Sequence, residues 1–230
     1  NIAENAGGPL CFEYGTTIDN LLSYRMVTPT GEMIEIIRRD HPRHKILPDE
    51  TAIFEVRDMS GGARNLVKLP GAELRTPGLG KDVTNKTLGG LPGVQKEGTD
   101  GVIIDATFIL HKQLEHYNVV VLEFYGRSME NCMLVVNDVV ALRNDIRRRG
   151  DLVKISALEE FGVKYVQAIN YVKKSAIYEG DPISVLILQL DSDDQRALSD
   201  AVRDVVSICQ SYDGVDAFVA KDAKEAELFW

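Results

Sequence analysis

The sequence has few of the residues from which metal sites and disulfide frameworks are built. It contains three cysteines, Cys11, Cys132 and Cys209, and four histidines in 230 residues. The cysteines lie far apart, so they form neither the CxxC pairs of a zinc site nor the framework of a small secreted domain. This pattern predicts reduced thiols and a cytoplasmic protein.

Long apolar runs and an excess of basic charge are also missing. No segment approaches the roughly 18 apolar residues that a membrane span requires, and none has the form of a signal peptide. The formal net charge of -9 disfavours a nucleic-acid surface, which needs clustered Lys and Arg. We therefore expect no nucleic-acid partner and no transmembrane segment. The apolar content of 44% is typical of a globular protein with one large or two modest domains.

The motifs of several enzyme classes are absent as well. There is no nucleophile-elbow motif around a serine, no Walker A loop and no Cys–His pair. No two carboxylates have a spacing that would indicate a catalytic dyad. The run His41–His44 has a metal-ligand spacing, but Pro42 and Pro48 disfavour a helix and no third ligand is near. We interpret it as a solvated basic loop. The acidic turn Asp191–Asp194 is interpreted as a helix cap, so no metal site is predicted.

Glycine, by contrast, is dense between Gly78 and Ile104. Seven glycines precede an apolar run there: Gly78, Gly80, Gly89, Gly90, Gly93, Gly98 and Gly101. A glycine-rich turn that feeds a strand presents backbone N–H groups to a ligand, usually one that carries phosphate. An ordinary structural loop is the alternative. The residues that follow, Val102–Ile104 and Ala106–Leu110, predict a buried strand.

Three segments resemble, in the same order, motifs of the FAD-linked oxidases typified by D-lactate dehydrogenase and glycolate oxidase. Ala3–Gly8 followed by Tyr14-Gly15 resembles the family's T-N-A-G-G…R-Y-G. Lys81–Thr84 resembles G-Y-D-L, and Gln95–Ile103 resembles G-S-E-G-T-L-G-I-I. The departures from these motifs are Glu4, Lys96 and Asp100.

The resemblance implies that FAD is the cofactor and that the chemistry is the flavin's own. It implies contacts to FAD from ten residues: Asn5, Ala6, Gly7, Gly8, Glu97, Gly98, Thr99, Gly101, Val102 and Ile103. It implies an FAD-dependent oxidoreductase acting on a small 2-hydroxy acid such as D-lactate or glycolate, with an iron–sulfur electron-transfer partner or domain. No catalytic residue is assigned. The alternative is a non-catalytic α+β module for ligand binding or interaction on the same scaffold.

The chain begins inside a motif and ends at Trp230 within a helical pattern. We therefore expect a fragment of a longer protein. In the family, a glycine-rich pyrophosphate loop lies upstream of the first motif and a histidine-rich segment lies downstream of the cap. The fragment alone is expected to hold no FAD and to be inactive.

Residues 1–112 are expected to form the C-terminal part of a PCMH-type FAD-binding domain of antiparallel strands with helices. Alternating apolar runs around turn residues predict strands. They cover Leu10–Tyr14, Tyr24–Thr28, Met33–Ile37, Ala52–Arg57 and Asn65–Leu69. A helix or turn is expected at Thr17–Leu22. Tyr24–Thr28 and Met33–Ile37 are expected to form a hairpin around the turn Pro29–Glu32. Ala52–Arg57 and Asn65–Leu69, joined by Ser60-Gly61-Gly62, are expected to form a second hairpin, inserted within residues 38–77. His111–His116 is expected to be a polar connector.

Residues 113–230 are expected to form a truncated substrate-side cap domain, a ferredoxin-like α+β unit with a mixed sheet. Apolar runs predict strands at Asn118–Phe124, Pro182–Leu190 and Val215–Ala220. Helical periodicity predicts helices at Asn131–Arg149, Ser156–Asn170, Asp194–Tyr212 and Ala223–Trp230. The whole chain is therefore assigned to the α+β class.

Overall fold

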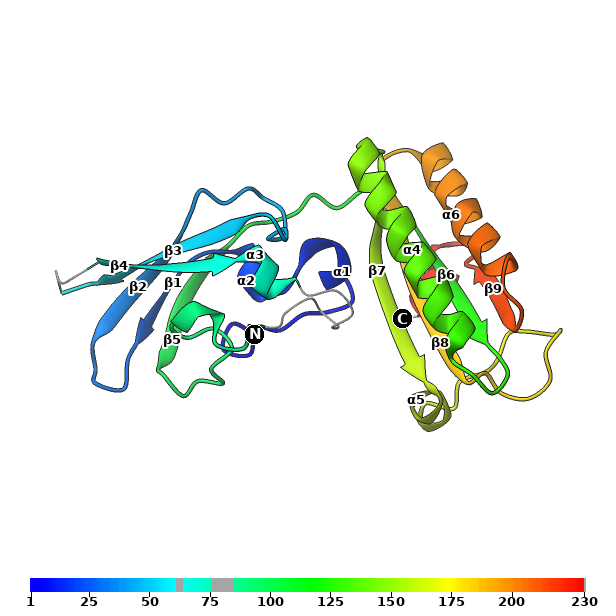
Figure 1. Ribbon diagram of the computed structural model, residues 1–230, viewed down its shortest axis with the longest axis horizontal. Coiled ribbons are helices and arrows are strands. Elements are labelled where there is room, and N and C mark those ends of the chain that lie inside the picture. Colours follow the sequence, from blue (N-terminus) through cyan, green and yellow to red (C-terminus); the bar gives the residue numbers. More distant parts are fainter. Residues whose placement is uncertain (61–63, 76–84, 230) are drawn as a thin grey trace. The chain divides into compact units, whose positions relative to one another are not determined.

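A computed structural model describes residues 1–60, 64–75 and 85–229. It divides the chain into two compact units, Asn1–Lys112 and Gln113–Trp230 (Figure 1). In the described part of the chain, no helix combines the length and the apolar character needed to span a membrane.

The first unit is built on one five-stranded sheet in the order β4-β3-β2-β1-β5, and every pairing is antiparallel. Its strands are β1 (Leu21–Val27), β2 (Met33–Arg39), β3 (Thr51–Asp58), β4 (Arg64–Pro70) and β5 (Val102–Phe108). Short helical turns accompany the sheet: α1 (Cys11–Tyr14), α2 (Thr17–Asn20), α3 (Gly71–Leu74) and the 3-10 turn η2 (Leu88–Gly90). Figure 1 shows α1, α2 and α3 toward one end of the strands.

Both predicted hairpins of this unit are confirmed. β1 and β2 pair antiparallel, and the Thr28 N–H donates to the Glu32 carbonyl at 2.9 Å across the turn. Gly31 in that turn has a φ of +83°, which glycine adopts without steric cost. β3 and β4 form the second antiparallel pair. Gly61 and Gly62, which were expected in its turn, lie outside the described residues.

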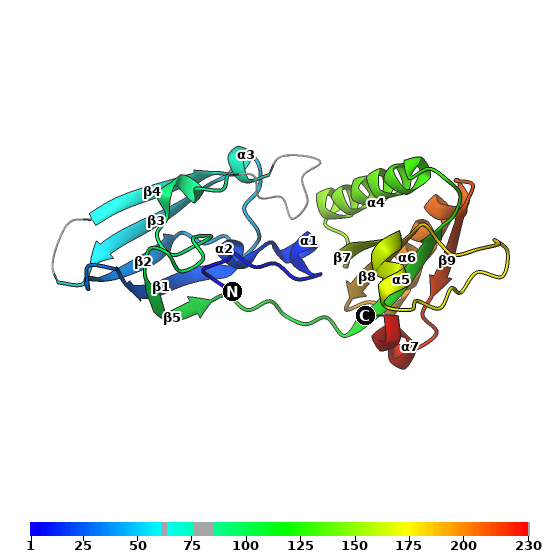
Figure 2. The same cartoon turned by 90° about the horizontal axis from the view of Figure 1, so that it is seen from below.

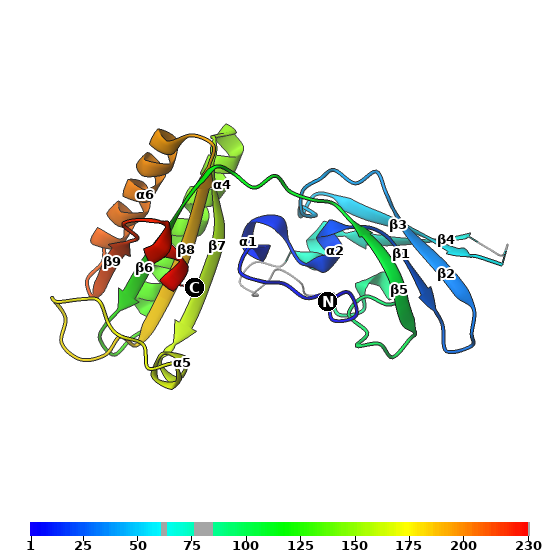
Figure 3. The ribbon, with the colours of Figure 1, turned by 180° about the vertical axis from the view of Figure 1, so that it is seen from behind.

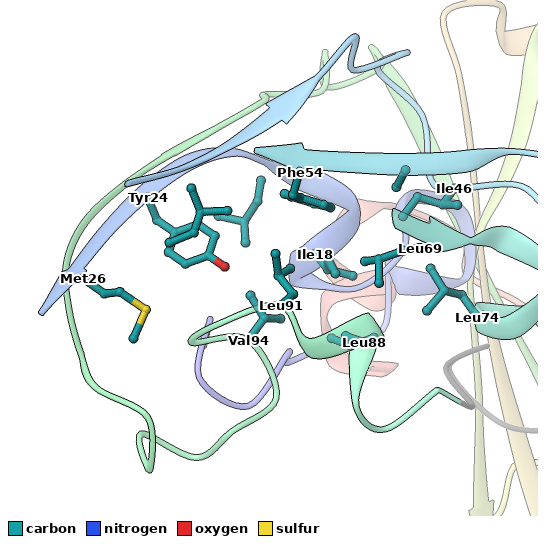
Figure 4. Close-up of a cluster of buried hydrophobic side chains, with 13 residues drawn as sticks. Ile18, Tyr24, Met26, Ile46, Phe54, Leu69, Leu74, Leu88, Leu91 and Val94 are labelled. Atoms are coloured by element: carbon teal, nitrogen blue, oxygen red, sulfur yellow. The ribbon is translucent and has the colours of Figure 1, made fainter. Parts of the chain in front are cut away.

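One face of this sheet carries the hydrophobic core (Figure 4). The buried side chains come from the strands, from α2 and from the glycine-rich segment: Ile18, Leu21, Tyr24, Met26, Ile36, Ile46, Ala52, Phe54, Leu69, Leu74, Leu88, Leu91 and Val94. Leu88, Leu91 and Val94 belong to the glycine-rich segment, so this part of the segment covers the core in addition to forming turns.

Two strand predictions in the first unit are wrong in part. Leu10–Tyr14 was expected as a strand, but Cys11–Tyr14 forms one helical turn, α1. β5 is a strand as predicted, yet it is not buried, and Val102 is 66% exposed. Among the described strands β5 pairs only with β1, so it forms an edge of the sheet and only Ile103 and Ala106 reach the core.

The interpretation of Arg38–Lys45, the segment around His41–His44, as a solvated basic loop is wrong in part, because only its middle, including Pro42 and Arg43, is exposed. Arg38 and Lys45 are buried, and the Lys45 ammonium donates to the Phe12 carbonyl at 2.8 Å. His41 Nε2 donates to the Asp19 carbonyl at 2.7 Å. These two hydrogen bonds fasten the loop to α1 through Lys45 and to α2 through His41. The described residues contain no group of three or more His, Cys, Asp or Glu side chains placed to hold a metal ion.

The second unit is a four-stranded sheet in the order β7-β8-β6-β9 with helices between the strands. Its elements are β6 (His116–Phe124), α4 (Glu130–Arg149), β7 (Val153–Gly162), α5 (Val163–Ala168), β8 (Ser184–Ser192), α6 (Gln195–Gln210), β9 (Val215–Val219) and α7 (Ala223–Phe229). This strand order is that of the ferredoxin-like fold. The expected mixed sheet is wrong, because β8 lies between β6 and β7 and every described pairing is antiparallel.

Helices pack on both faces of this second sheet. Figures 1 and 2 show α4 and α6 along one face, and Figure 3 shows α5 and α7 on the other. Val119 and Val121 of β6 pack with Val166 of α5 and Ala226 of α7 in one buried cluster. Covering both faces explains why β6 is a continuous apolar run rather than an alternating one.

The predicted helix Ser156–Asn170 is wrong for its first half. Those residues belong to β7, which pairs with β8 from Val153 opposite Ser192 to Gly162 opposite Ser184. Only Val163–Ala168 is helical, so tertiary pairing outweighs the helical spacing of the apolar residues. The other helices are confirmed. α4 ends at Gly150 with a φ of +72°, and Asp194 caps α6 as predicted.

Candidate functional site

The motif segments Ala3–Gly8 and Gln95–Ile103 lie near opposite ends of the first unit's sequence, and in the structure they contact each other. The backbone N–H groups of Lys96 and Glu97 both donate to the carbonyl of Ala3, at 2.8 Å each. The Gln95 N–H points at the Ile2 carbonyl at 3.5 Å. The two segments that contain the residues predicted to contact FAD are therefore joined by backbone hydrogen bonds, although the sequence separates them widely.

The N-terminal motif is fixed to the start of α2. Asn5 is 7% exposed with a φ of +50°, and its side-chain oxygen accepts a 2.9 Å hydrogen bond from the Ile18 N–H. The Ala6 carbonyl accepts from both the N–H and the hydroxyl of Thr17, at 3.0 and 2.8 Å. Asn5 and Ala6 thus position the turn through their bonds to the helix, and the amide oxygen of Asn5 is already used.

The four predicted glycines divide into two kinds. A Cβ on Gly7 would lie 3.2 Å from the Thr16 methyl group, and a Cβ on Gly101 would lie 2.4 Å from the Val27 carbonyl oxygen. The packing of the chain itself excludes a side chain at Gly101, and at Gly7 it leaves a Cβ only tight space against Thr16. A Cβ on Gly8 or Gly98 would meet nothing within 4 Å. Only Gly8 and Gly98 leave the backbone open to close approach from outside.

Gly8 and Gly98 also carry unused backbone donors. Neither N–H group makes a hydrogen bond within the described residues. Glu97 and Gly98 both have left-handed backbone, with φ of +53° and +77°, and Thr99 closes the turn by donating its hydroxyl to the Lys96 carbonyl at 2.6 Å. Open backbone with free N–H groups suits an anionic ligand.

Two buried acceptors of the same motif lack a hydrogen bond. They are Gln95 Oε1 and Asp100 Oδ1. The other oxygen of Asp100 accepts from the Gly93 N–H at 2.8 Å, which explains why a carboxylate replaces the family's apolar residue. Burial, with Asp100 nearby, raises the pKa of Tyr24, whose hydroxyl donates to the Pro92 carbonyl at 2.5 Å.

The last two predicted residues have different environments. Val102 pairs with Val27 at the start of β5 and is exposed, whereas the Ile103 side chain packs against the core. The segment Lys81–Thr84, which also carried the resemblance, lies outside the described residues, as do Gly78 and Gly80.

Sequence reasoning missed a buried ionic network beside this surface. Asp19 is fully buried, and its Oδ1 accepts from Arg75 and from the Ile46 N–H at 2.8 Å. Its Oδ2 accepts from the Thr16 N–H at 2.8 Å, forming a capping box at α2. Thr16 followed by an acidic residue three positions later is a readable signal for such a cap.

A second missed cluster lies in the second unit around Glu123, which is fully buried. Its Oε1 accepts from the Tyr171 hydroxyl at 2.8 Å and the Lys174 N–H at 2.7 Å. Its Oε2 accepts from the Tyr125 hydroxyl at 2.6 Å and the Ser175 N–H at 2.9 Å. Burial and the nearby carboxylate raise the pKa of both tyrosines. The sequence signal for this cluster is a single glutamate, Glu123, within the apolar run Asn118–Phe124.

Comparisons with known proteins add information on the fold. No family model and no curated protein matches the sequence. The chain is similar in structure to alkyldihydroxyacetonephosphate synthase in its P1 crystal form, with a TM-score of 0.51 and 12% identity over 99% of this chain and 35% of that one. The P212121 form of the same synthase gives a TM-score of 0.47 and 14% identity, with the same coverage of both chains.

The chain thus spans 35% of the length of the solved structures that it matches. At this sequence identity the likeness concerns the fold alone. The chain has an α+β fold of antiparallel sheets and helices that is similar to part of this synthase.

Proposed function

We propose that the chain is part of an FAD-dependent oxidoreductase and that its first unit holds one side of the cofactor. The second unit would then be the substrate-side domain. The observation that supports this proposal is the joining of the two motif segments through the Ala3 carbonyl. The turn that contains Gly98 is thereby joined to the N-terminal segment that leads to Gly8, and a Cβ on either glycine would meet nothing within 4 Å.

The donor and acceptor groups of this surface fit the adenosine diphosphate half of FAD. The free N–H groups of Gly8 and Gly98 would bind pyrophosphate oxygens. The unpaired oxygens of Gln95 and Asp100 would accept hydrogen bonds from ribose hydroxyl or adenine amino groups. When bound, FAD would supply the acceptor for hydride from the substrate, and the residues of this chain would bind and orient it.

The finer parts of the proposal rest on the motif resemblance. It supports a 2-hydroxy acid such as D-lactate or glycolate as the substrate, and an iron–sulfur protein or domain as the electron acceptor. The synthase with the similar fold is named for a different product, so the fold does not choose the substrate. Cys11, Cys132 and Cys209 form no disulfide with one another, which is in keeping with a reducing, cytoplasmic setting.

The experiment is an absorption spectrum of the purified full-length protein, in wild-type form and in two matched variants. Gly8→Val fills the open space beside the motif backbone. Gly162→Val is the control, because a Cβ at Gly162 would likewise cause no clash: its nearest atom would be Glu160 Oε1, at the ordinary contact distance of 3.7 Å. We expect flavin absorbance in the wild type and in Gly162→Val, and at least about tenfold less flavin per protein in Gly8→Val.

Two outcomes would contradict the proposal. Wild-type protein without flavin, even after incubation with FAD, would favour the non-catalytic interaction module. Equal flavin content in the two variants would show that the surface around Gly8 does not approach the cofactor.

A further inference from the structure

Arg38, near the end of β2, is a buried cation without a hydrogen-bond or ion-pair partner among the described residues. The residue is 8% exposed, and its guanidinium makes no hydrogen bond and no ion pair in the described part of the chain. Nε and Nη1 are both shielded from solvent and unsatisfied. Buried polar groups are nearly always paired, and an unpaired buried charge is costly. Arg38 therefore requires an explanation.

Phe54 lies over the guanidinium of Arg38. Its central carbon lies 5.2 Å from the centroid of the Phe54 ring, on the neighbouring strand β3. The ring covers one face of the cation. The N–H groups along the edges of a guanidinium form a planar fork that matches a carboxylate or a phosphate group.

The carboxylates nearest to Arg38 are already committed to other donors. Asp19 and Glu50 act on Arg38 through their charge. Asp19 is bound by Arg75 and by two backbone N–H groups. Glu50 accepts from the Leu47 N–H at 2.8 Å and lies 3.3 Å from His44. Burial outweighs both charges and lowers the pKa of Arg38.

The nearest histidine is also satisfied. His41 donates from Nε2 to the Asp19 carbonyl and accepts at Nδ1 from the Arg43 N–H at 2.9 Å. This pair of bonds holds the ring in one neutral tautomer. Asp19, Arg75 and His41 each have a hydrogen-bond partner nearby, whereas the Arg38 guanidinium has none among the described residues.

We propose that Arg38 binds the oxyanion group, a carboxylate or a phosphate, of a small molecule. Such a group would satisfy the buried N–H donors in the bidentate geometry that arginine favours and would balance its charge. A metal cation is excluded from this position by the charge of the guanidinium. The site is independent of the proposed flavin surface, because none of the residues of that surface takes part in it.

The test uses isothermal titration calorimetry on the 230-residue chain in a low-salt buffer free of oxyanions. Inorganic phosphate and D-lactate are the two probes, and they distinguish a phosphate site from a carboxylate site. The variants are Arg38→Met, which keeps the volume without the charge, and Arg39→Met. Arg39 is the matched control, because it is the next residue, half exposed, and already paired with Glu55.

We expect saturable binding of at least one probe to the wild type, binding at least about tenfold weaker to Arg38→Met, and wild-type affinity in Arg39→Met. Thermal unfolding gives a second readout. Without oxyanion, Arg38→Met should melt above the wild type because an unpaired buried charge has been removed. The probe should then raise the melting temperature of the wild type only.

The proposal is overturned if neither probe binds to the wild type at about 10 mM. It is also overturned if Arg38→Met binds the probe as tightly as the wild type does. If Arg38→Met does not fold, Arg38→Lys is measured in its place. This variant keeps the charge without the fork, so unchanged affinity in it would contradict bidentate recognition.

Discussion

The backbone N–H of Glu97 donates to the carbonyl of Ala3 at 2.8 Å, and Lys96 shares the same acceptor. The first residues of the unit and its glycine-rich turn thus hold each other in place. A substitution in either segment can act through packing or through ligand binding. The glycines separate these effects, because a Cβ added at Gly101 would clash with the protein itself, whereas a Cβ added at Gly98 would meet nothing within 4 Å.

Gly101→Ala tests the packing role. The new Cβ would lie 2.4 Å from the Val27 carbonyl oxygen, and the φ of +146° disfavours a side chain. We expect the first unit to lose about 2–4 kcal/mol of stability. Gly98→Ala should lose only about 1 kcal/mol, because its strain is conformational and the space is open. Hydrogen exchange of β1 and β5 peptides in urea measures both. Equal losses would contradict this division of the glycines.

Asp19→Asn tests the buried ionic network. The change removes the charge that pairs with Arg75, whose side chain is 5% exposed, and leaves that cation buried. We expect the first unit to lose about 3–5 kcal/mol. The control is Asp200→Asn, whose partner Arg203 is exposed, and it should change stability by at most about 1 kcal/mol. Urea denaturation of each variant is the measurement, and similar midpoints would refute the prediction.

The first unit should lose stability as the pH falls below the ordinary histidine value of 6.5. Burial, Arg38 and His44 lower the pKa of His41 in the folded state, against the opposing effect of Asp19. Between the two pKa values the unfolded chain binds more protons, so stability increases with pH. His41→Gln should reduce this slope. NMR titration of the ring protons checks the pKa directly, and a value above 6.5 would reverse the sign.

Glu123→Leu should release the segment that contains Lys174 and Ser175. The carboxylate accepts both of their backbone N–H groups, and leucine accepts none. We expect trypsin to cut faster after Lys173 or Lys174. Asp138→Asn is the control, because Asp138 binds the Tyr212 hydroxyl at an exposed position. Mass spectrometry of the early fragments shows the sites, and unchanged cleavage in Glu123→Leu would mean that other contacts hold the segment.

Local chemistry was sufficient to predict the hairpins and two long helices. The turn Pro29–Glu32 breaks two apolar runs, and Asp194 begins a regular helical spacing, so each signal lies within a few residues of its element. The fold class followed from the order of such elements. Ser156–Gly162 could not be read in this way, because its strand conformation depends on pairing with β8, far along the chain.

The motifs named the candidate residues only as a set and did not distinguish their structural roles. The motifs gave Gly7, Gly8, Gly98 and Gly101 equal weight. Only the structure shows that Val27 and Thr16 occupy the space beside two of them. Arg38 was missed for a related reason. Its burial depends on Phe54, which a strand pairing places beside it.

The exposed edge strand β5 also bears on solubility. The run from Val102 to Phe108 is apolar apart from Asp105 and Thr107, and runs of this kind promote strand-to-strand association between molecules. Asp105 stands at the centre of the run, paired with Arg25. Antiparallel addition of a second copy about this centre would bring two Asp105 side chains together. The carboxylate is therefore placed as a gatekeeper against aggregation.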